Sequence, residues 1–204
     1  MTGEPAVFLS ASVPQEGRLG SEDYDPFLIK EAVSALIEVV LGRYLLVWGG
    51  QPAITPMIWE AARRYDVSYP EVVTLYQSAF FKDRYPEENT KFGNFVETPA
   101  TPGNQDASLE RMRQSMLSEH NYKAAIFIGG MEGIRDEYHL FAKLNPDAIL
   151  LPIPSPGGYA RTLFEQTEGL PPELNGAVDY TYWLYKLLNV DLATKRRASL
   201  KIDG

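Results

Sequence analysis

Short apolar runs alternate with longer amphipathic segments along most of this chain, and this alternation limits the folds open to it. Most of the runs are apolar at consecutive positions, which is typical of strands buried on both faces. The connectors between them are long enough to form helices. Strands of this kind joined by helical crossovers predict an α/β fold, with a doubly wound, mostly parallel sheet inside a three-layer sandwich.

Six runs have the composition of buried strands: residues 6–12, 44–50, 71–78, 94–100, 124–130 and 148–155. Helices are expected to begin at Asp25-Pro26, Thr55-Pro56 and Asp106, because oxygen-bearing caps and an early proline mark helix starts. Three further helices are expected, one ending near Phe141, one opening at Gly157-Gly158 and one over about 177–189. The charged segment 82–93 is expected to form an exposed loop.

The composition favours one soluble domain. The 204 residues, with no internal repeat or linker, predict a single domain whose core spans about 6–165, followed by the 177–189 helix and a basic tail. The absence of cysteine excludes disulfide scaffolds and thiolate chemistry and favours a reducing cytoplasm. Glu4 stands where a signal peptide needs positive charge, and no apolar run approaches the ~20 residues of a membrane span. We therefore expect a cytoplasmic protein without membrane contact.

The charge distribution argues against nucleic acid as a partner. The net charge is −8, and an acidic surface repels a phosphodiester backbone over long range, so duplex nucleic acid is not expected to bind. The dense basic run Lys195-Arg196-Arg197, with Lys201 beyond it, is interpreted as a solvated tail. His120 and His139 lack the spacing of a helical metal pair, so neither a metal nor a cofactor is predicted.

The ends of the predicted strands carry the candidate ligand site, because open parallel sheets bind ligands beyond the carboxyl ends of their strands. The four candidate exits are Ser10-Ala11-Ser12, Gly49-Gly50, Gly129-Gly130 and Ser155-Pro156-Gly157-Gly158. Three contain a glycine pair, which allows the backbone to approach a ligand closely. Amides at a helix start favour anions, so the repeated pattern predicts a nucleotide-like small molecule as ligand. A tight strand-to-helix turn explains any single glycine pair equally well.

Two of these exits resemble the glycine motifs of the SLOG superfamily, the Rossmann-like group that includes the cytokinin-activating LOG enzymes. They are WGGQPAITPMI (48–58) and FIGGMEGIRDE (127–137). FLSASVP (8–14) and PIPSPGG (152–158) look like the branch found in bacterial conflict and antiviral systems, called SLOG cluster 3. The resemblance covers roughly residues 6–165. It implies a Rossmann-like fold that senses a nucleotide or an NAD-derived signal of cyclic ADP-ribose type, beside a TIR, Sir2 or other effector partner.

The resemblance also implies roles for single residues. The second LOG motif reads PGG-x-GT-x-x-E and follows a helix that carries an arginine. Gly129 and Gly130 match the glycine pair, Gly133 the third glycine and Glu137 the glutamate. The arginine corresponds to Arg113 or to Arg111, and the spacing does not choose between them. LOG enzymes cleave the bond between base and ribose phosphate, where a carboxylate can stabilise an oxocarbenium-like ribose and a guanidinium can bind phosphate.

The chain departs from the LOG motif at three places. Ile128 replaces the proline and Ile134 the threonine, and one extra residue between the glycines introduces Glu132. A carboxylate in the first helical turn complements the helix dipole, but it repels phosphate and suits ribose hydroxyl groups. We therefore expect the 129–133 turn to face a sugar, with phosphate bound nearer 49–55 with help from Thr55.

Several assignments stay open. Ser10 and Ser12 bind phosphate or are plain turn residues, and Tyr159 is expected at the ligand edge because it follows Gly158. Three functions fit the sequence. The first is a ligand sensor, the second a LOG-like phosphoribohydrolase using Glu137 with Arg113, and the third an interaction subunit without a ligand that works through the 177–189 helix. A homodimer or higher homo-oligomer is expected in each case.

Overall fold

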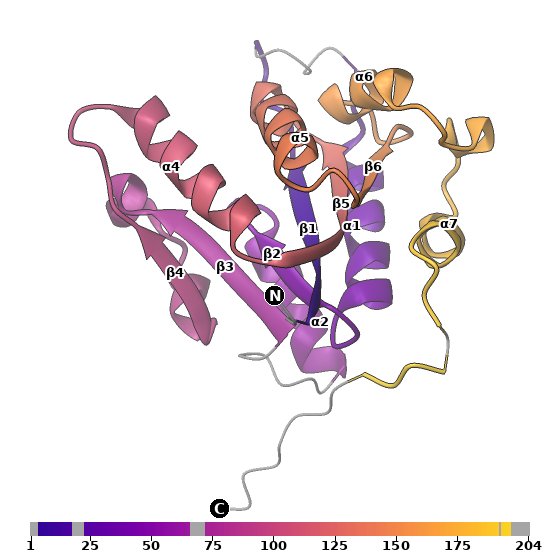
Figure 1. Cartoon of the computed structure of the whole chain (residues 1–204), viewed down its shortest axis with the longest axis horizontal. Coiled ribbons are helices and arrows are strands. Elements are labelled where there is room, and N and C mark those ends of the chain that lie inside the picture. The colour runs from indigo at the N-terminus through magenta and orange to yellow at the C-terminus, as the bar shows by residue number, and fades with distance from the viewer. Residues whose placement is uncertain (1–3, 18–22, 66–71, 192, 197–204) are drawn as a thin grey trace, which may run out of the picture.

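One parallel sheet of six strands, in the order β4-β3-β2-β1-β5-β6, organises the computed structural model (Figure 1). The structure describes residues 4–17, 23–65, 72–191 and 193–196. The strands are β1 (Pro5–Ser12), β2 (Leu45–Trp48), β3 (Val73–Ser78), β4 (Asn94–Thr98), β5 (Asn121–Gly129) and β6 (Ile149–Ile153). The chain adds strands outward from β1 to β4 and then returns to place β5 and β6 on the other side of β1. The strand order therefore reverses between β1 and β5.

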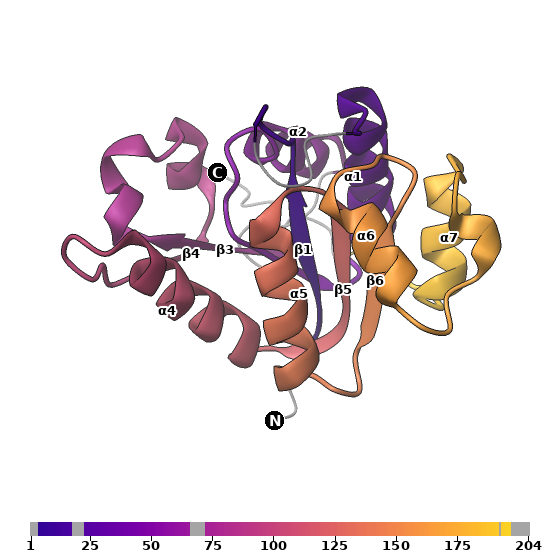
Figure 2. The same ribbon diagram turned by 90° about the horizontal axis from the view of Figure 1, so that it is seen from above.

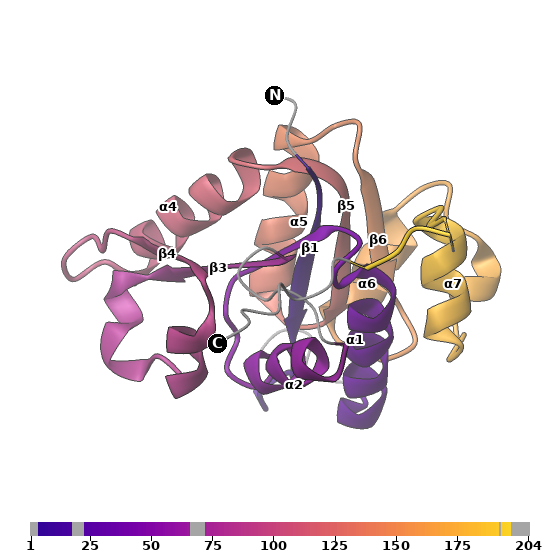
Figure 3. The ribbon, with the colours of Figure 1, turned by 90° about the horizontal axis from the view of Figure 1, so that it is seen from below.

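Helices cover both faces of the sheet, which confirms the predicted doubly wound α/β sandwich (Figures 2 and 3). One face carries α1 (Pro26–Val40), α2 (Thr55–Tyr65) and α7 (Tyr180–Leu187). The other carries α4 (Gln105–Ser118), α5 (Glu132–Leu144) and α6 (Tyr159–Gln166). Within the described part of the chain, no helix is long and apolar enough to cross a membrane.

The apolar residues of β1 alternate between two hydrophobic cores. Val7 and Leu9 pack in the core beneath α1, α2 and α7, whereas Ala6 and Phe8 pack in the core beneath α4, α5 and α6. Phe8 stacks on Phe141 of α5 with ring centroids 5.8 Å apart. Both faces of β1 are buried, which explains why its sequence is apolar at consecutive positions.

The predicted starts of α1 and α4 have different outcomes. The Asp25 carboxylate accepts hydrogen bonds from the amides of Phe27 and Leu28 at 2.8 and 3.2 Å, so the predicted cap of α1 is confirmed. The helix predicted to open at Asp106 is present, with Asp106 in its first turn, but its start differs by one residue. The side-chain oxygen of Asn104 accepts from the Ala107 amide at 3.0 Å, and this cap starts α4 one residue earlier than Asp106.

The segment predicted as an exposed loop at 82–93 instead contains short 3₁₀ helices, η1 (Ala79–Arg84) and η2 (Glu87–Lys91). Phe92 is buried and its ring lies 6.4 Å from that of Trp48, which is itself buried at the end of β2. Asn89 is buried as well. The charged residues mark the outer side of this segment, but its apolar residue fixes it against the sheet.

The C-terminal region is part of the sandwich. The expected helix at 177–189 is present as α7, which follows the short η3 (Pro172–Leu174) and packs along α1 in all three views (Figure 1). Arg196 donates to the carbonyl oxygens of Leu41 and Glu38 at 2.7 and 2.5 Å. Lys195 is exposed, as the interpretation of a solvated tail requires, whereas Arg196 is only partly exposed and satisfies carbonyl groups at the end of α1. Arg197 and Lys201 lie outside the described residues.

Candidate functional site

The ends of β1 and β5 lie side by side where the strand order reverses. Ser12 of β1 is paired with Gly129 of β5, and the Gly130 amide donates to the Ser12 carbonyl oxygen at 2.9 Å. Two of the four candidate exits therefore meet at one point of the sheet edge. This is where doubly wound sheets place their ligands.

Three side chains from three elements converge beside this point. The Ser10 hydroxyl, at the end of β1, donates to Oε2 of Glu137 on α5 at 2.5 Å. Nε of Arg113, on α4, donates to the other oxygen of Glu137 at 3.4 Å. Ser10 is buried, and the side chains of Arg113 and Glu137 are each 16% exposed. This Ser10–Glu137–Arg113 cluster thus combines a hydroxyl, a carboxylate and a guanidinium in a partly buried setting.

The structure chooses between the two candidate arginines. Arg113 faces α5 and reaches Asp136 as well, at 3.5 Å, whereas Arg111 is exposed on α4. A Cβ atom on Gly133 would lie 3.2 Å from the guanidinium of Arg113. The third glycine of the motif therefore leaves room for this arginine against the first turn of α5.

The loop after β6 packs directly on the end of β5. Gly158 has a φ of +68°, and a Cβ atom there would lie 2.5 Å from the carbonyl carbon of Gly129, so glycine is required. The segment leading into α1 crosses this loop. The Asp25 amide donates to Pro156, the Gly158 amide donates to Asp23, each at 2.9 Å, and Arg161 pairs with the Asp23 carboxylate. The exits after β1, β5 and β6 therefore form one connected edge.

Several glycine amides at this edge already donate hydrogen bonds within the protein. Besides those of Gly130 and Gly158, the Gly157 amide donates to the Pro154 carbonyl oxygen at 3.0 Å. These three amides are not available to an anion in this conformation. The glycines act instead through the close backbone contacts that they allow.

The turn after β2 is held by a residue that the sequence patterns did not single out. Nε2 of Gln77 donates to the Gly50 carbonyl oxygen at 2.7 Å and to that of Gly49 at 3.3 Å. Thr55 is fully buried, and its hydroxyl donates to the Gln51 carbonyl oxygen at 3.2 Å. Phosphate binding by Thr55 would require exchange of that bond. The signal for Gln77 was a polar residue within an otherwise apolar strand.

The helix starts at this edge differ in how they are capped. The first amides of α1 bind the Asp25 carboxylate, so that start is closed to another anion. By contrast the N-cap residues of α5 and α6, Met131 and Gly158, make no side-chain capping hydrogen bond. Glu132 occupies the first turn of α5, and the Tyr159 amide, at the start of α6, donates to Gly130 at 3.0 Å. The uncapped starts therefore flank the β1–β5 junction.

Ser155 points away from this junction. Its hydroxyl donates to the Ala177 carbonyl oxygen at 2.6 Å and lies 3.0 Å from the Tyr180 hydroxyl. It connects the loop after β6 to the start of α7. Its placement gives it a structural contact that the sequence did not indicate.

The described residues contain no group of three or more acidic or histidine side chains that could hold a metal ion. His120, half-buried before β5, contacts the Tyr76 hydroxyl at 2.9 Å through Nε2. Tyr76 donates its only hydrogen to Glu119 at 2.8 Å, so it accepts from an Nε2–H of His120. Burial lowers the pKa of His120, against a smaller opposing effect of Glu119.

We expect this histidine to make stability depend on pH. Because the folded-state pKa of His120 is depressed, the unfolded chain binds the proton first as the pH falls. Its contribution is complete above about pH 6.5 and decreases below that value, by at most about 1.4 kcal/mol per pH unit. Urea unfolding between pH 5 and 8 measures this. The slope should disappear in His120→Gln and persist in His139→Gln, whose side chain is exposed; equal slopes in both variants would contradict the assignment.

The family comparison agrees with the fold. A family model described as the SLOG cluster3 family matches residues 21–188. The match includes both residues of the pair and continues through α7, beyond residue 165 where the resemblance of the sequence motifs ended. No curated protein matches the chain. Since the matched range is most of the chain and the sheet has the Rossmann-like order, the chain belongs to the SLOG cluster3 family.

Proposed function

We propose that this chain binds a nucleotide or an NAD-derived signal of cyclic ADP-ribose type, at the edge where β1 meets β5. Membership of the SLOG cluster3 family supports a nucleotide-related, LOG-like domain. In this proposal the domain is the ligand sensor of a cytoplasmic bacterial defence system, as a homo-oligomer coupled to an effector such as a TIR or Sir2 protein.

The observation that carries the proposal is the convergence of Ser10, Glu137 and Arg113. Ser10 and Glu137 are 127 residues apart in sequence, yet their oxygens lie 2.5 Å apart at the point where the strand order reverses. A structural ion pair alone does not need a buried hydroxyl from a third element. A ribose phosphate needs hydrogen-bond acceptors for its hydroxyl groups and a cation for its phosphate, and the cluster supplies both.

In this proposal the two charged groups have different roles: Arg113 binds the phosphate and Glu137 binds the sugar. The contacts of Arg113 with Glu137 and Asp136 are long, at 3.4 and 3.5 Å, so the guanidinium can exchange them for shorter bonds to a phosphate. Glu137 remains oriented by the short bond from Ser10 and accepts from a sugar hydroxyl. Glu132 adds negative charge on the sugar side, which keeps the phosphate toward Arg113.

A thermal-shift screen tests the proposal. The panel contains nucleoside monophosphates, NAD, ADP-ribose and the cyclic ADP-ribose isomers. A ligand present at about 100 times its dissociation constant stabilises the native state by about 2.7 kcal/mol, which raises the Tm of a chain of this size by roughly 5–11 °C. Glu137→Gln should reduce that shift, because an amide offers one acceptor oxygen where the carboxylate offers two. A Glu137→Gln variant with an unchanged shift for every ligand would count against the site.

The second candidate is a phosphoribohydrolase, and the Arg113–Glu137 pair itself favours it because the LOG motif implies the same two residue types. In that reaction water adds to the anomeric carbon and the base leaves with a proton. Incubation of the same panel with the protein, followed by chromatography for free base, detects turnover. Release of base that is abolished by Glu137→Gln supports the enzyme, whereas binding without release supports the sensor. Silence in both assays from a folded protein supports the interaction subunit.

A further inference from the structure

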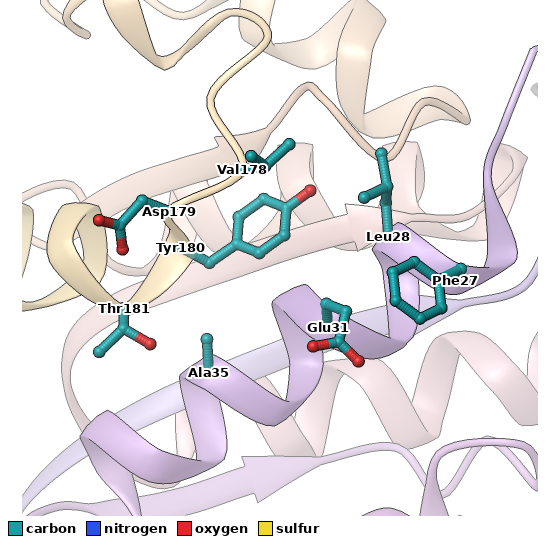
Figure 4. A pocket seen from close by; sticks show the side chains of 8 residues that line it. All are labelled: Phe27, Leu28, Glu31, Ala35, Val178, Asp179, Tyr180 and Thr181. Atoms are coloured by element: carbon teal, nitrogen blue, oxygen red, sulfur yellow. The ribbon is translucent and has the colours of Figure 1, made fainter.

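A groove separates α1 from the start of α7, on the face of the sheet opposite the Ser10–Glu137–Arg113 cluster (Figure 4). Its volume is about 370 Å³. The lining residues are Phe27, Leu28, Glu31, Ala35, Val178, Asp179, Tyr180 and Thr181. Figure 4 shows Phe27 and Val178 on opposite sides of it, with the Tyr180 ring between the two helices.

The groove gathers apolar side chains that remain exposed. Phe27 is 64% exposed and Val178 is 63% exposed. Two of the four large hydrophobic residues that are exposed in the described part of the chain, Phe27 and Val178, thus line this groove. Exposed apolar side chains that cluster in this way mark interaction surfaces.

The charges around the groove have one sign. Glu31 and Asp179 line it, and none of its lining residues is a lysine or arginine. Burial raises the pKa of Tyr180, and the nearby carboxylates of Asp25 and Glu31 act in the same direction. The groove is therefore apolar at its walls and acidic at its rim.

A neighbouring groove shows that this charge pattern is specific. The groove between α1 and α2 has a volume of about 520 Å³, but Lys30 and Arg64 balance Glu38 and Glu60 along it. The two grooves share α1 as a wall. Of these two grooves, the α1–α7 groove alone combines exposed apolar walls with unbalanced acidic charge.

We propose that the α1–α7 groove binds a cationic amphipathic segment of a partner protein, with a large apolar side chain seated between Phe27 and Val178 and flanking lysine or arginine residues beside Glu31 and Asp179. Seating an amphipathic segment in a groove between helices is a common mode of peptide recognition. A second copy of this chain fits poorly, because a twofold contact through this face would bring Glu31 and Asp179 against the same carboxylates.

A synthetic peptide with leucine at positions i and i+4 of a lysine-rich helix serves as the probe. We expect it to shift the backbone NMR signals of residues 27–35 and 178–182 of the full chain. Two matched peptides separate the two parts of the recognition: one replaces lysine with glutamate, and the other replaces leucine with serine. Both should bind at least about tenfold more weakly, because each removes one of the two complementary features.

Paired variants localise the binding. Glu31→Lys should weaken binding of the lysine–leucine peptide at least about tenfold. Phe27→Ser should weaken it to the same degree without unfolding the chain, because Phe27 is largely exposed. The matched control is Glu60→Lys in the α1–α2 groove, which carries the same charge change and should leave binding within about twofold. Binding at high salt should weaken but persist, because the apolar contact is not screened.

Three results overturn the proposal. The first is absence of binding. The second is equal loss in Glu31→Lys and Glu60→Lys, or NMR shifts scattered over the surface, because either means general attraction to an acidic protein. The third is a native dimer, seen by light scattering, that Phe27→Ser dissociates, because the occupant is then a second copy. None of these measurements depends on a ligand at the β1–β5 junction.

Discussion

Gly158→Ala is expected to lower the free energy of unfolding by about 3 kcal/mol, and the Tm by roughly 6–12 °C. Gly158 has φ +68° and ψ −167°, a region that only glycine occupies without strain. The added Cβ would also lie 2.5 Å from a backbone carbon of Gly129, which cannot move as a side chain can. The loop after β6 must then separate from the end of β5. Urea unfolding followed by circular dichroism measures the loss.

Gly103→Ala is the matched control, because Gly103 has the same φ of +68° but a Cβ there meets nothing within 4 Å. It should cost about 1–2 kcal/mol, the strain of a positive φ alone. A Gly158→Ala variant no less stable than Gly103→Ala would show that the loop after β6 is not packed on β5. Gly158→Ala, unlike Gly103→Ala, should also lose ligand binding, because the sheet edge that carries the site would change shape.

Arg113→Ala is expected to weaken binding of ADP-ribose by about 10–100-fold, the loss typical of a hydrogen-bonded charged group. Arg113 is the only residue of the cluster that can bind a phosphate as a cation, and its present contacts with Glu137 and Asp136 are long. Arg113→Lys should recover part of the affinity, because it keeps the charge but loses the planar fork. Isothermal titration calorimetry measures each variant.

Arg111→Ala provides the control for charge. Arg111 lies two residues away on α4 and is exposed, so its removal changes the net charge equally without altering the cluster. It should change the affinity less than about twofold. Equal losses for the two alanine variants would mean that a general electrostatic attraction, and not the cluster, binds the phosphate.

The fold was predictable because each of its main elements has a local signal. β1 is apolar on both faces, and Asp25-Pro26 combines a cap with a favoured first residue of a helix. Two predictions differed from the structure: the first residue of α4 and the exposure of residues 82–93. Asn104 and Asp106 both have side chains that cap helices, and only the folded backbone chooses between them. The charged residues of 82–93 predicted an exposed loop, but Phe92 in this segment is buried. Its burial depends on contact with Trp48 of β2, which the local sequence does not indicate.

The candidate site was predictable only in part. The motif named Glu137 and a nearby arginine, but the choice of Arg113 depends on how α4 packs against α5, which the motif does not encode. Whether Ser10 was a turn residue or a ligand contact could not be decided, because its partner is 127 residues away. Gln77 lies outside every motif found in the sequence. Its role arises because β3 lies beside β2, so its amide reaches the turn after that strand.

The hydroxyl of Ser155 has a consequence for the whole domain. It joins the loop that packs on β5 to both the backbone before α7 and the Tyr180 hydroxyl, so a displacement of that loop would strain both contacts with the α7 region. Two occupants, one at each end of this connection, would then share a single free-energy coupling. By thermodynamic reciprocity, whatever factor the first applies to the affinity of the second, the second applies to the first.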